Sequence, residues 1–503
     1  MLTRLKVSGF KNLLDVDVRF GPFTCIAGPN GVGKSNLLDA ITFLSDLADK
    51  PLIEAARSVR DQSGRRGEVR NLFSRVGDRH SGVMEFLVEM VVPLQGTDDL
   101  GLSVKASVSF LRYKLEIRHR QNGAAATGSP LEIRHESLER IKLGEAWEHL
   151  LFPHNKKWRQ SAVSGLGRKL PGHRTAPFIS TSLDEGAPVI KIHQDQTGGR
   201  PLKYLAPNLP KTILSSAAAE IPTAALARAE MRSWRLLQLE PGALRQPDGY
   251  GAETRLNSNG AHLAATLHRL ASAPPDWNAE RQLEHREAVF ARIANQLSEL
   301  IDVREISIAE DDKRELYQVI VRGRDGTAHP AMSLSDGTLR FLALAVLAED
   351  PSEGGLICLE EPENGIHPER VTSMLELLQS IATDPQRPVS DENPLRQVII
   401  NTHSPVVAAE TPAQDLMFAS QVDILPEFAE GPVPGLALRC VSGTWRETAA
   451  GMRAVSRGTI LNFLKPVAER AVFGERRSRA GTAASRLIDQ PDLQSTLHFE
   501  DPD

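Results

Sequence analysis

The residues best suited to chemistry form a segment near the N-terminus, Gly28-Pro-Asn-Gly-Val-Gly-Lys34-Ser35. It matches the pattern G-x-x-x-x-G-K-[S/T], in which glycines let the backbone wrap around a phosphate with its N–H groups pointing inward. The lysine of this pattern reaches the β- and γ-phosphates, and the serine hydroxyl is a ligand for Mg²⁺. The alternative is a glycine-rich turn that matches by accident. Because an apolar strand pattern precedes the segment and a helical pattern follows it, we favour phosphate binding.

Two adjacent acidic residues supply the second chemical group. Glu360 and Glu361 directly follow the apolar segment 356–359. In P-loop ATPases a carboxylate at the end of such a strand holds Mg²⁺, and a second carboxylate can orient and deprotonate water. We expect Glu360 to hold the metal together with Ser35, and Glu361 to be the base. The alternative is a pair of glutamates that ends a strand and faces solvent.

Two further motifs are weaker when taken alone. Ser335, Asp336 and Gly337 precede a segment rich in leucine and alanine, and a hydroxyl with bare N–H groups at a helix N-terminus suits an anion. A simple helix N-cap explains the same residues. His403 follows the apolar run 398–400, but a histidine in an ordinary loop is an equal interpretation.

Regular elements must position these motifs. Alternation and helical periodicity predict strands at 3–7, 14–20, 23–27, 84–92, 103–111, 113–118, 303–308, 315–322, 355–359 and 397–401. They predict helices at 34–47, 259–271, 279–301, 336–349, 368–383 and 458–470. No element can be placed from about 150 to 210, and the chain beyond about 425 reads as loop-rich apart from its one helix.

Composition limits the class of protein. The chain has 503 residues, of which 41% are hydrophobic and 24% charged, which is ordinary for a globular protein. Its net charge of −5 provides no overall positive field, so any contact with nucleic acid must use a local patch. Cys25, Cys358 and Cys440 are far apart and form no CxxC pair. No signal-peptide pattern or long apolar run occurs, so we expect a cytoplasmic protein without a membrane partner.

The order of the motifs resembles the ABC-type ATPases of the SMC/RecF/OLD-like group. The phosphate loop, the Leu-Ser-Asp-Gly-Thr segment at 334–338, the Glu-Glu-Pro-Glu segment at 360–363 and the Thr-His-Ser segment at 402–404 follow the order of that group. The resemblance covers about 1–95 and 300–410. The middle of the chain, at 232–241 and 259–264, resembles the bacterial AAA family ATPase branch associated with anti-phage and toxin–antitoxin loci.

This resemblance implies an α/β fold. The expected architecture is a P-loop NTPase ABC-type head with a mixed sheet, an antiparallel β section, a helical or irregular insertion and a short loop-rich C-terminal tail. Residues 1–95 are expected to form the N-terminal part of the head, and 96–300 a β-rich then helical insertion. Residues 301–425 are expected to complete the head, and 426–503 to form a partly disordered extension. Long heptads are missing, so no coiled-coil arm is expected, and the sequence after His403 predicts no nuclease domain.

The resemblance also implies a mechanism in which two heads sandwich two ATP molecules. Ser335 and Gly337 of one subunit would face the γ-phosphate that Lys34 of the other subunit holds. Glu361 would position water, and His403 would sense or stabilise the γ-phosphate. ATP and Mg²⁺ are the expected ligands. The residues expected to bind nucleotide are Gly28, Pro29, Asn30, Gly31, Val32, Gly33, Lys34, Ser35, Asn36, Ser335, Asp336 and Gly337.

The sequence departs from the ABC pattern at two points. Many ABC ATPases have aspartate at the metal position, where this chain has Glu360, a form that the OLD-like branch shares. The usual ABC glutamine has no clear counterpart, and Gln62 is the nearest candidate.

We therefore expect an ATP-hydrolysing switch that forms a homodimer or higher homo-oligomer and senses or controls a partner, such as a toxin, effector or nuclease, in phage defence. The alternatives are a RecF-like DNA repair ATPase and a nucleotide-dependent scaffold for a toxin or effector. Segment 154–174 is either a DNA-binding patch or a solvated loop, since it is basic and contains Trp158 but no acidic residue. A second basic cluster comprises Arg470, Arg476, Arg477 and Arg479.

Overall fold

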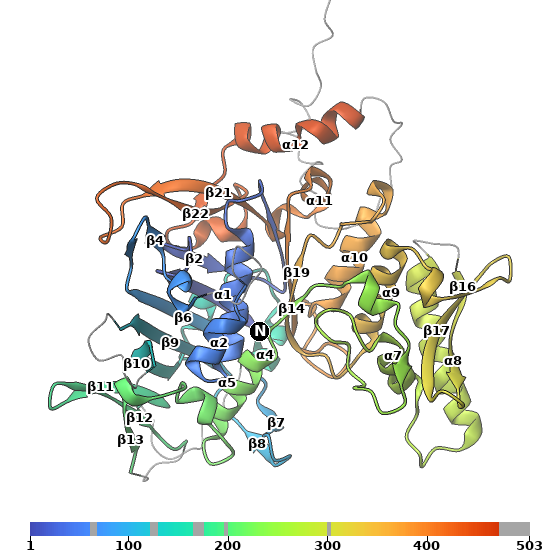
Figure 1. Ribbon diagram of the computed structural model, residues 1–503, viewed down its shortest axis with the longest axis horizontal. Helices are drawn as coiled ribbons and strands as arrows, with labels where there is room; N and C mark the ends of the chain where they lie inside the picture. Colours follow the sequence, from blue (N-terminus) through green and yellow to red (C-terminus); the bar gives the residue numbers. More distant parts are fainter. Residues whose placement is uncertain (61–67, 121–128, 164–175, 196–199, 299–302, 472–503) are drawn as a thin grey trace, which may run out of the picture.

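Two large β-sheets form the body of the molecule, and a lobe of helices with a small sheet lies beside them (Figure 1). The computed structural model describes residues 1–60, 68–120, 129–163, 176–195, 200–298 and 303–471. The first large sheet is mostly parallel and the second is antiparallel.

The mostly parallel sheet contains the strands that carry the predicted motifs. Its order is β14 (Arg235–Leu237), β19 (Gly355–Glu360), β20 (Arg396–Thr402), β3 (Phe23–Ala27), β21 (Leu416–Ile424), β22 (Val433–Cys440) and β23 (Arg453–Ala454). Strands from β14 to β21 run parallel, whereas β22 is antiparallel to β21. Strands β3, β19 and β20 are buried along almost their whole length. Burial on both faces explains why their sequences are continuously apolar rather than alternating.

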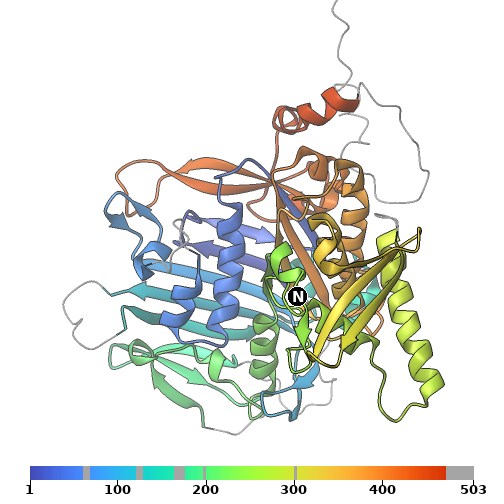
Figure 2. The same ribbon diagram turned by 45° about the vertical axis from the view of Figure 1, so that its right-hand side comes forward.

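The antiparallel sheet has eight strands. Their order is β13 (Leu202–Leu205), β12 (Ala187–Ile192), β11 (Ile179–Asp184), β10 (Leu131–Arg140), β9 (Phe110–His119), β6 (Val83–Val91), β1 (Leu2–Ser8) and β2 (Val16–Arg19). Helix α1 (Lys34–Leu47) lies across this sheet (Figure 2) and contributes to one apolar core that also contains Ile399 of β20. The helix that follows the phosphate loop therefore packs against both large sheets through one apolar core.

A second apolar core lies on the other face of the parallel sheet. It joins Cys25, Ile357 and Ile400 of that sheet to the helices and the small sheet of the lobe. The helices on this side are α6 (Pro241–Leu244), α7 (Leu263–Ala271), α8 (Ala279–Ser298), α9 (Asp336–Glu349), α10 (Val371–Ile381), α11 (Pro405–Glu410) and α12 (Arg457–Ala471). The small sheet contains β15 (Asp248–Gly249), β17 (Leu316–Gly323), β16 (Val303–Asp311) and β18 (Ala328–Pro330). Helix α9 is apolar almost all round, and most of it is buried accordingly.

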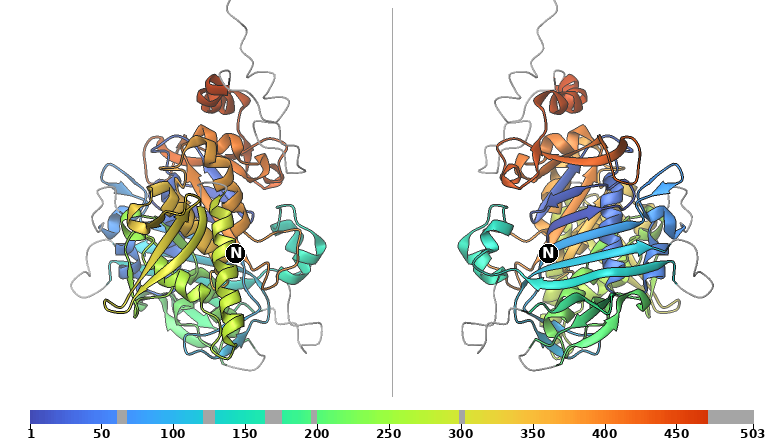
Figure 3. Two further views of the ribbon diagram at one scale, coloured as in Figure 1. Left: turned by 90° about the vertical axis from the view of Figure 1, so that its right-hand side faces the viewer. Right: turned by 90° about the vertical axis from the view of Figure 1, so that its left-hand side faces the viewer.

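The remaining helices and strands complete the structure. They are α2 (Leu52–Ser58), α3 (Ala146–His149), α4 (Lys156–Ala162), α5 (Pro222–Arg232), β4 (Arg75–Val76), β5 (Arg79–His80), β7 (Gln95–Thr97) and β8 (Ser103–Lys105). Short 3-10 helices lie at Val69–Leu72, Ala206–Asn208, Leu214–Ser216, Ala331–Ser333, Pro368–Arg370, Ala413–Asp415 and Trp445–Thr448. Helices α3 and α4 stand at one side of the body (Figure 3), where the amide of Asn155 donates to the carbonyl of Pro385 at 3.0 Å.

The predicted α/β fold class is confirmed, while several element boundaries are wrong. The strand predicted at 103–111 is broken into β8 and β9, because the backbone amide of Ser107 donates to the hydroxyl of Thr223 instead of entering a ladder, while the hydroxyl of Ser109 donates to the carbonyl of Ala162. The helix predicted at 259–271 begins at Leu263, and the helix predicted at 368–383 opens with a 3-10 turn at Pro368.

Two regions hold more regular structure than the sequence predicted. Strands β11, β12 and β13 lie where no element could be placed, and β22 forms an eight-residue strand in the part expected to be loop-rich. The four-part domain division stays a prediction, and strands β9, β10 and β14 of segment 96–300 belong to the two large sheets. The expected disorder of the far C-terminus concerns 472–503, which lie outside the described residues.

Candidate functional site

The predicted phosphate loop connects β3 to α1, as the strand–loop–helix pattern requires. The amide of Gly28 donates to the carbonyl of Thr402 at 3.1 Å, which ties the start of the loop to the end of β20. Gly31 and Gly33 have φ angles of 81° and 109°, a left-handed conformation that side chains rarely adopt. These two positions therefore need glycine for the loop to turn.

Asn12, for which the sequence predicted no role, supports the phosphate loop from outside. Its side-chain amide donates to the carbonyl of Val32 at 2.9 Å, and its carbonyl accepts from the amide of Asn36 at 2.8 Å. A Cβ atom at Gly33 would lie only 2.2 Å from the Asn12 side chain, so the loop and this asparagine fit closely. Asn12 lies in the turn between β1 and β2, within the opening segment 5–12 that resembles the first strand and turn of the SMC/RecF/OLD-like group.

Lys34 lies folded over the loop. Its ammonium group donates to the carbonyls of Gly28 and Pro29 at 2.7 and 2.8 Å, and only 6% of the residue is exposed. Burial lowers the pKa of Lys34, and the negative charges of Glu361, Glu363 and Glu360 oppose this shift. The lysine thus points along the inside of a loop whose N–H groups suit an anion.

Glu360 ends β19 and accepts hydrogen bonds from several elements. Its donors are Arg60 at 2.5 Å, Gln238 at 3.3 Å, Asn401 at 3.4 Å and the hydroxyl of Ser35. Although burial alone would raise the pKa of Glu360, the hydrogen bonds from Arg60 and Ser35 lower it, so the carboxylate is charged. A hydroxyl in contact with a charged carboxylate is a hard oxygen donor set, and Ser35 and Glu360 fit Mg²⁺.

Gln238 is the second residue that sequence reasoning missed. It follows β14, which pairs in parallel with β19 and places Gln238 beside Glu360 at the same edge of the sheet. Gln62, the glutamine candidate from the sequence, lies outside the described residues. The signal in the sequence that could have indicated this site is that Gln238 directly follows the short apolar run 236–237, as Glu360 follows 356–359.

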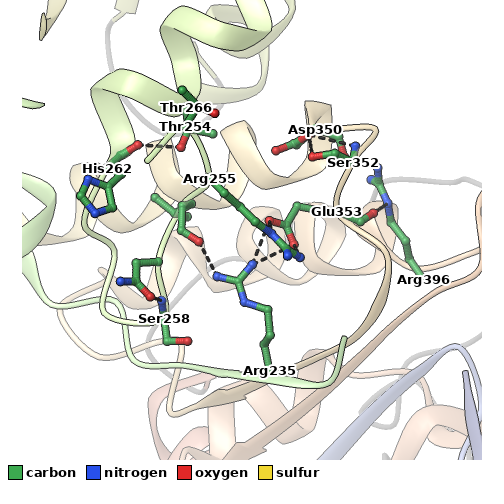
Figure 4. Close-up of polar contacts among 12 residues, drawn as sticks. Arg235, Thr254, Arg255, Ser258, His262, Thr266, Asp350, Ser352, Glu353 and Arg396 are labelled. Carbon is green, nitrogen blue, oxygen red and sulfur yellow. Dashed lines mark hydrogen bonds and ion pairs between the residues drawn. The ribbon is translucent and has the colours of Figure 1, made fainter. Parts of the chain in front are cut away.

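The opposite ends of β14 and β19 are fixed by an ion cluster around Glu353 (Figure 4). Glu353 is 1% exposed and accepts from Arg235 at 2.8 and 2.9 Å and from Arg255 at 2.8 and 3.0 Å. Arg396 of β20 donates to the backbone carbonyl of Glu353 at 2.6 Å. The cluster joins three neighbouring strands to the lobe, and so sets how the strands carrying Gln238 and Glu360 lie together.

Glu361 has a φ angle of 46°, which is unusual for a residue with a side chain. Its amide donates to the backbone carbonyl of Asn401 at 3.0 Å, and one carboxylate oxygen lies 2.7 Å from Nδ1 of His403. Its other carboxylate oxygen accepts from Asn364 at 2.9 Å. Two loops therefore hold this side chain in a defined orientation at the cavity.

A buried carboxyl group links these two loops. Glu363 is 9% exposed and accepts a hydrogen bond from the hydroxyl of Thr402, which in turn accepts from the amide of Ser404 at 2.8 Å. Burial raises the pKa of Glu363. The segment after β19 is in this way joined to the segment that carries His403.

The phosphate loop and the acidic end of β19 line an open cavity of about 800 Å³. Its lining from the predicted set comprises Asn30, Gly31, Gly33, Lys34, Ser35, Asn36, Glu360 and Glu361. Gly28, Pro29, Val32 and His403 do not line the cavity themselves but are hydrogen-bonded to Lys34, Lys34, Asn12 and Glu361, respectively. Gln238, Arg340, Asn364 and Asn401 are among the other residues that line the cavity.

The Leu-Ser-Asp-Gly-Thr motif does not meet the phosphate loop within the chain. Ser335 caps α9 by accepting from the amide of Thr338, and together with Gly337 it lines a separate cavity of about 130 Å³. Asp336 pairs with Arg245 at 2.5 Å. A Cβ atom at Gly337 would lie 2.7 Å from the carbonyl of Gly365, which explains the need for glycine there.

The basic segment 154–174 is described only in part. Lys156 and Lys157 are exposed on α4, but Trp158 is fully buried and cannot stack on a nucleic-acid base. Arg168, Lys169 and Arg174 lie outside the described residues, as do Arg476, Arg477 and Arg479, and nothing is described of the Arg470 side chain.

A family model described as "AAA domain, putative AbiEii toxin, Type IV TA system" matches residues 23–86 and 206–409, just over half of the chain. The chain belongs to this family. The AAA-domain match begins at β3, includes the phosphate loop, and resumes before α5 to include β14, the motif before α9, and strands β19 and β20. It thus contains both halves of the cavity described above.

Similarity to curated proteins is confined to short segments. An OLD nuclease from Thermus scotoductus is 54% identical over 41 residues, which are 8% of this AAA-domain chain and 8% of the nuclease. The DNA replication and repair protein RecF from Magnetococcus marinus is 51% identical over 45 residues, 9% of this chain and 12% of RecF. The matches therefore span only a small part of these relatives.

One solved structure, of an Smc head bound to the C-winged helix domain of ScpA, is 12% identical with a TM-score of 0.45, over 88% of this chain and 98% of that one. In the described part of the chain, no helix combines the length and apolarity needed to cross a membrane.

Proposed function

We propose that this protein binds and hydrolyses ATP with Mg²⁺ and acts as a nucleotide-driven switch. The observation that carries the proposal is the shared cavity of about 800 Å³, which brings Lys34 and Ser35 together with Glu360 and Glu361. The phosphate loop binds the triphosphate, and the ammonium of Lys34 exchanges the carbonyls of Gly28 and Pro29 for phosphate oxygens. Ser35 and Glu360 hold Mg²⁺, which neutralises charge on the phosphates when it is bound.

Glu361 is the general base of the proposed reaction. Its carboxylate takes a proton from water while the water oxygen bonds to the γ-phosphorus and the bond to the β,γ-bridging oxygen breaks. The products are ADP and phosphate. His403, 2.7 Å from Glu361, orients the carboxylate and contacts the γ-phosphate.

The position of Ser335 and Gly337 supports a head-to-head dimer. They line a different cavity from Lys34, so one chain by itself does not surround a nucleotide with both motifs. The hydroxyl of Ser335 and the N-terminus of the 14-residue helix α9 suit a γ-phosphate supplied by a second copy. ATP would then join two heads, and hydrolysis would release them.

The test compares ATP hydrolysis and light-scattering mass for the wild type, two lysine variants and one serine variant. Lys34→Ala should abolish phosphate release and ATP-dependent dimerisation, whereas Lys105→Ala, at an exposed position of β8, should behave as the wild type. Ser335→Arg should bind ATP but stay monomeric, because a long cation would block the closing surface. Hydrolysis by Lys34→Ala at the wild-type rate would contradict the proposal.

The biological setting proposed is control of a toxin, effector or nuclease partner in phage defence. The toxin–antitoxin wording of the family description supports it. The segment shared with RecF supports the alternative of a DNA repair ATPase, with DNA contacts from segment 154–174. Duplex DNA that stimulates ATP hydrolysis in a salt-dependent manner would favour the RecF-like alternative. A Glu361→Gln protein with full biological activity would instead favour a nucleotide-dependent scaffold for a toxin or effector.

A further inference from the structure

The guanidinium group of Arg60 lies where a metal ion would need access to Glu360. Arg60 follows α2, and its Nη1 atom donates to Oε2 of Glu360 at 2.5 Å. Ser35 is hydrogen-bonded to the same carboxylate. Both oxygen ligands of the proposed cation are thus close to a third group that is itself a cation.

A buried aspartate anchors Arg60 independently of Glu360. Oδ1 of Asp39, on α1, accepts from Nε and Nη2 of Arg60 at 2.9 and 2.8 Å. Oδ2 of Asp39 accepts from Lys11 at 2.7 Å, and Lys11 also donates to the backbone carbonyl of Arg60 at 2.8 Å. The Asp39 side chain is 7% exposed and the Arg60 side chain 37% exposed, so the anchoring carboxylate is buried while the guanidinium borders solvent.

The charges in this cluster direct Arg60 to Glu360. Lys11 and Arg60 share one carboxylate at Asp39, so one positive charge is left over, and Glu360 balances it. A divalent cation on the same carboxylate would lie a few ångströms from the guanidinium. Like charges at that distance repel one another, and the two cations compete for the same oxygens.

We propose that Arg60 is a reversible occupant of the metal position, which neutralises Glu360 in the absence of a divalent cation and releases it when the cation binds. The hydrogen bonds between Asp39 and Arg60 remain after this release, so the guanidinium group moves away from Glu360 while α2 stays in place. Arg60 is therefore a positioning residue that weakens cation binding to the empty head and keeps Glu360 oriented for it. The proposal rests on the metal site of the proposed function.

A distinctive consequence is that loss of Arg60 strengthens metal binding. If the ion pair between Arg60 and Glu360 were merely structural, its removal would leave Glu360 less well oriented and would weaken metal binding. The experiment measures Mn²⁺ binding to the full chain by titration with electron paramagnetic resonance detection, both without nucleotide and with a non-hydrolysable ATP analogue. Arg60→Ala should bind Mn²⁺ about three- to ten-fold more tightly than the wild type without nucleotide.

Three variants complete the experiment. Arg57→Ala, which removes an exposed arginine of α2, should match the wild type. Glu360→Gln should lose the added affinity when combined with Arg60→Ala. Arg60→Gln is the second form of the test, because glutamine keeps a polar side chain if alanine impairs folding.

The proposal would be overturned if Arg60→Ala and Arg60→Gln bound Mn²⁺ as weakly as the wild type or more weakly. It would also be overturned if no protein bound Mn²⁺ detectably, either with or without the ATP analogue. ATP hydrolysis is not needed for this measurement. If the wild type hydrolyses ATP but the Arg60 variants bind Mn²⁺ as the wild type does, only the role of Arg60 is rejected. If the Arg60 variants bind Mn²⁺ more tightly but the wild type does not hydrolyse ATP, the proposed reaction is rejected and the role of Arg60 remains.

Discussion

Nδ1 of His403 lies 2.7 Å from Oε1 of Glu361, although 42 positions separate the two residues in the chain. The contact exists because β19 and β20 are parallel neighbours with Glu360 opposite Asn401, so the loops after both strands leave the sheet at the same edge. The backbone carbonyl of Asn401 accepts from the amide of Glu361, and the side chain of Asn364 donates to the second carboxylate oxygen of Glu361. This pair is where we expect proton transfer and nucleotide sensing to meet.

Replacing the proposed base should separate nucleotide binding from turnover. Glu361→Gln keeps the size of the side chain but cannot accept a proton, so phosphate release should fall by about 100-fold or more while ATP affinity changes less than about three-fold. Phosphate release and binding of a fluorescent ATP analogue measure the two quantities. Glu369→Gln is the control, since its side chain is 87% exposed. Wild-type turnover by Glu361→Gln would remove this residue from the mechanism.

Loss of the imidazole should affect the rate more than binding. In His403→Ala the Glu361 carboxylate keeps its Asn364 contact but loses its partner on the other side. We expect kcat to fall about 10- to 100-fold with KM nearly unchanged, because the histidine acts at the reacting end of the nucleotide. His329→Ala, at an exposed position in β18, is the matched control. An increase in KM alone would show that His403 only binds substrate.

Asn12 should prove important for nucleotide affinity rather than for folding. Asn12→Ala removes the hydrogen bonds to Val32 and Asn36 and leaves the phosphate loop less ordered. At about 1 kcal/mol for each hydrogen bond, the Kd for ATP should rise about 10- to 30-fold. Isothermal titration measures this, with Asn208→Ala, an exposed residue, as control. Unchanged affinity would show that the loop is preorganised without Asn12.

The cluster around Glu353 should be important for stability. Glu353→Gln leaves Arg235 and Arg255 around a neutral group, and breaking a buried ion pair in this way costs about 3–5 kcal/mol. The melting temperature should fall by about 5–10 °C. Glu427→Gln, at an exposed position, should leave it unchanged. A variant as stable as the wild type would show that the surrounding strands suffice to hold β14 against β19.

Glu89 should make the protein sensitive to acid. It is fully buried on β6 and contacts Arg4, Arg19, Arg112 and His149. Burial is the largest single effect and would raise its pKa, but hydrogen bonds from His149 and Arg112 and the charges of Arg19 and His149 together outweigh burial and lower the pKa to about 2. A lowered pKa means that this stabilisation is complete above about pH 4.5, the ordinary value, and is lost as pH falls towards 2.

The variant Glu89→Gln tests this pH dependence. At pH 7 its free energy of unfolding should be about 2–3 kcal/mol lower than that of the wild type, and the difference should shrink between pH 4.5 and 3. Thermal melting followed across this pH range measures the effect. Glu85→Gln, an exposed position on the same strand, should be pH-insensitive by comparison. A difference that stays constant with pH would assign the loss to packing rather than to charge.

Contiguous motifs could be predicted because their chemistry is local. The phosphate loop is defined by glycines and a lysine within eight residues, and its strand and helix follow from continuous apolar runs. The strand break at 106–109 was missed because side chains of Ser107 and Ser109 and their neighbours bond to distant segments. Strands β11 to β13 were missed because their buried and exposed residues do not alternate regularly, and β13 is exposed throughout, so their sequences carry little periodic signal.

By itself, the sequence determined the phosphate loop, the acidic end of β19 and the α/β class. Each of these depends on residue types at short spacing and on the burial of continuous apolar strands. Only the tertiary structure decided that Asn12 supports the loop, that Gln238 and Arg60 reach Glu360, and that His403 meets Glu361. The physical reason is that the order and register of the strands determine which strand ends lie at the same edge of the sheet. Single polar residues in loops form no periodic pattern, so their sequence does not predict which of them will meet there.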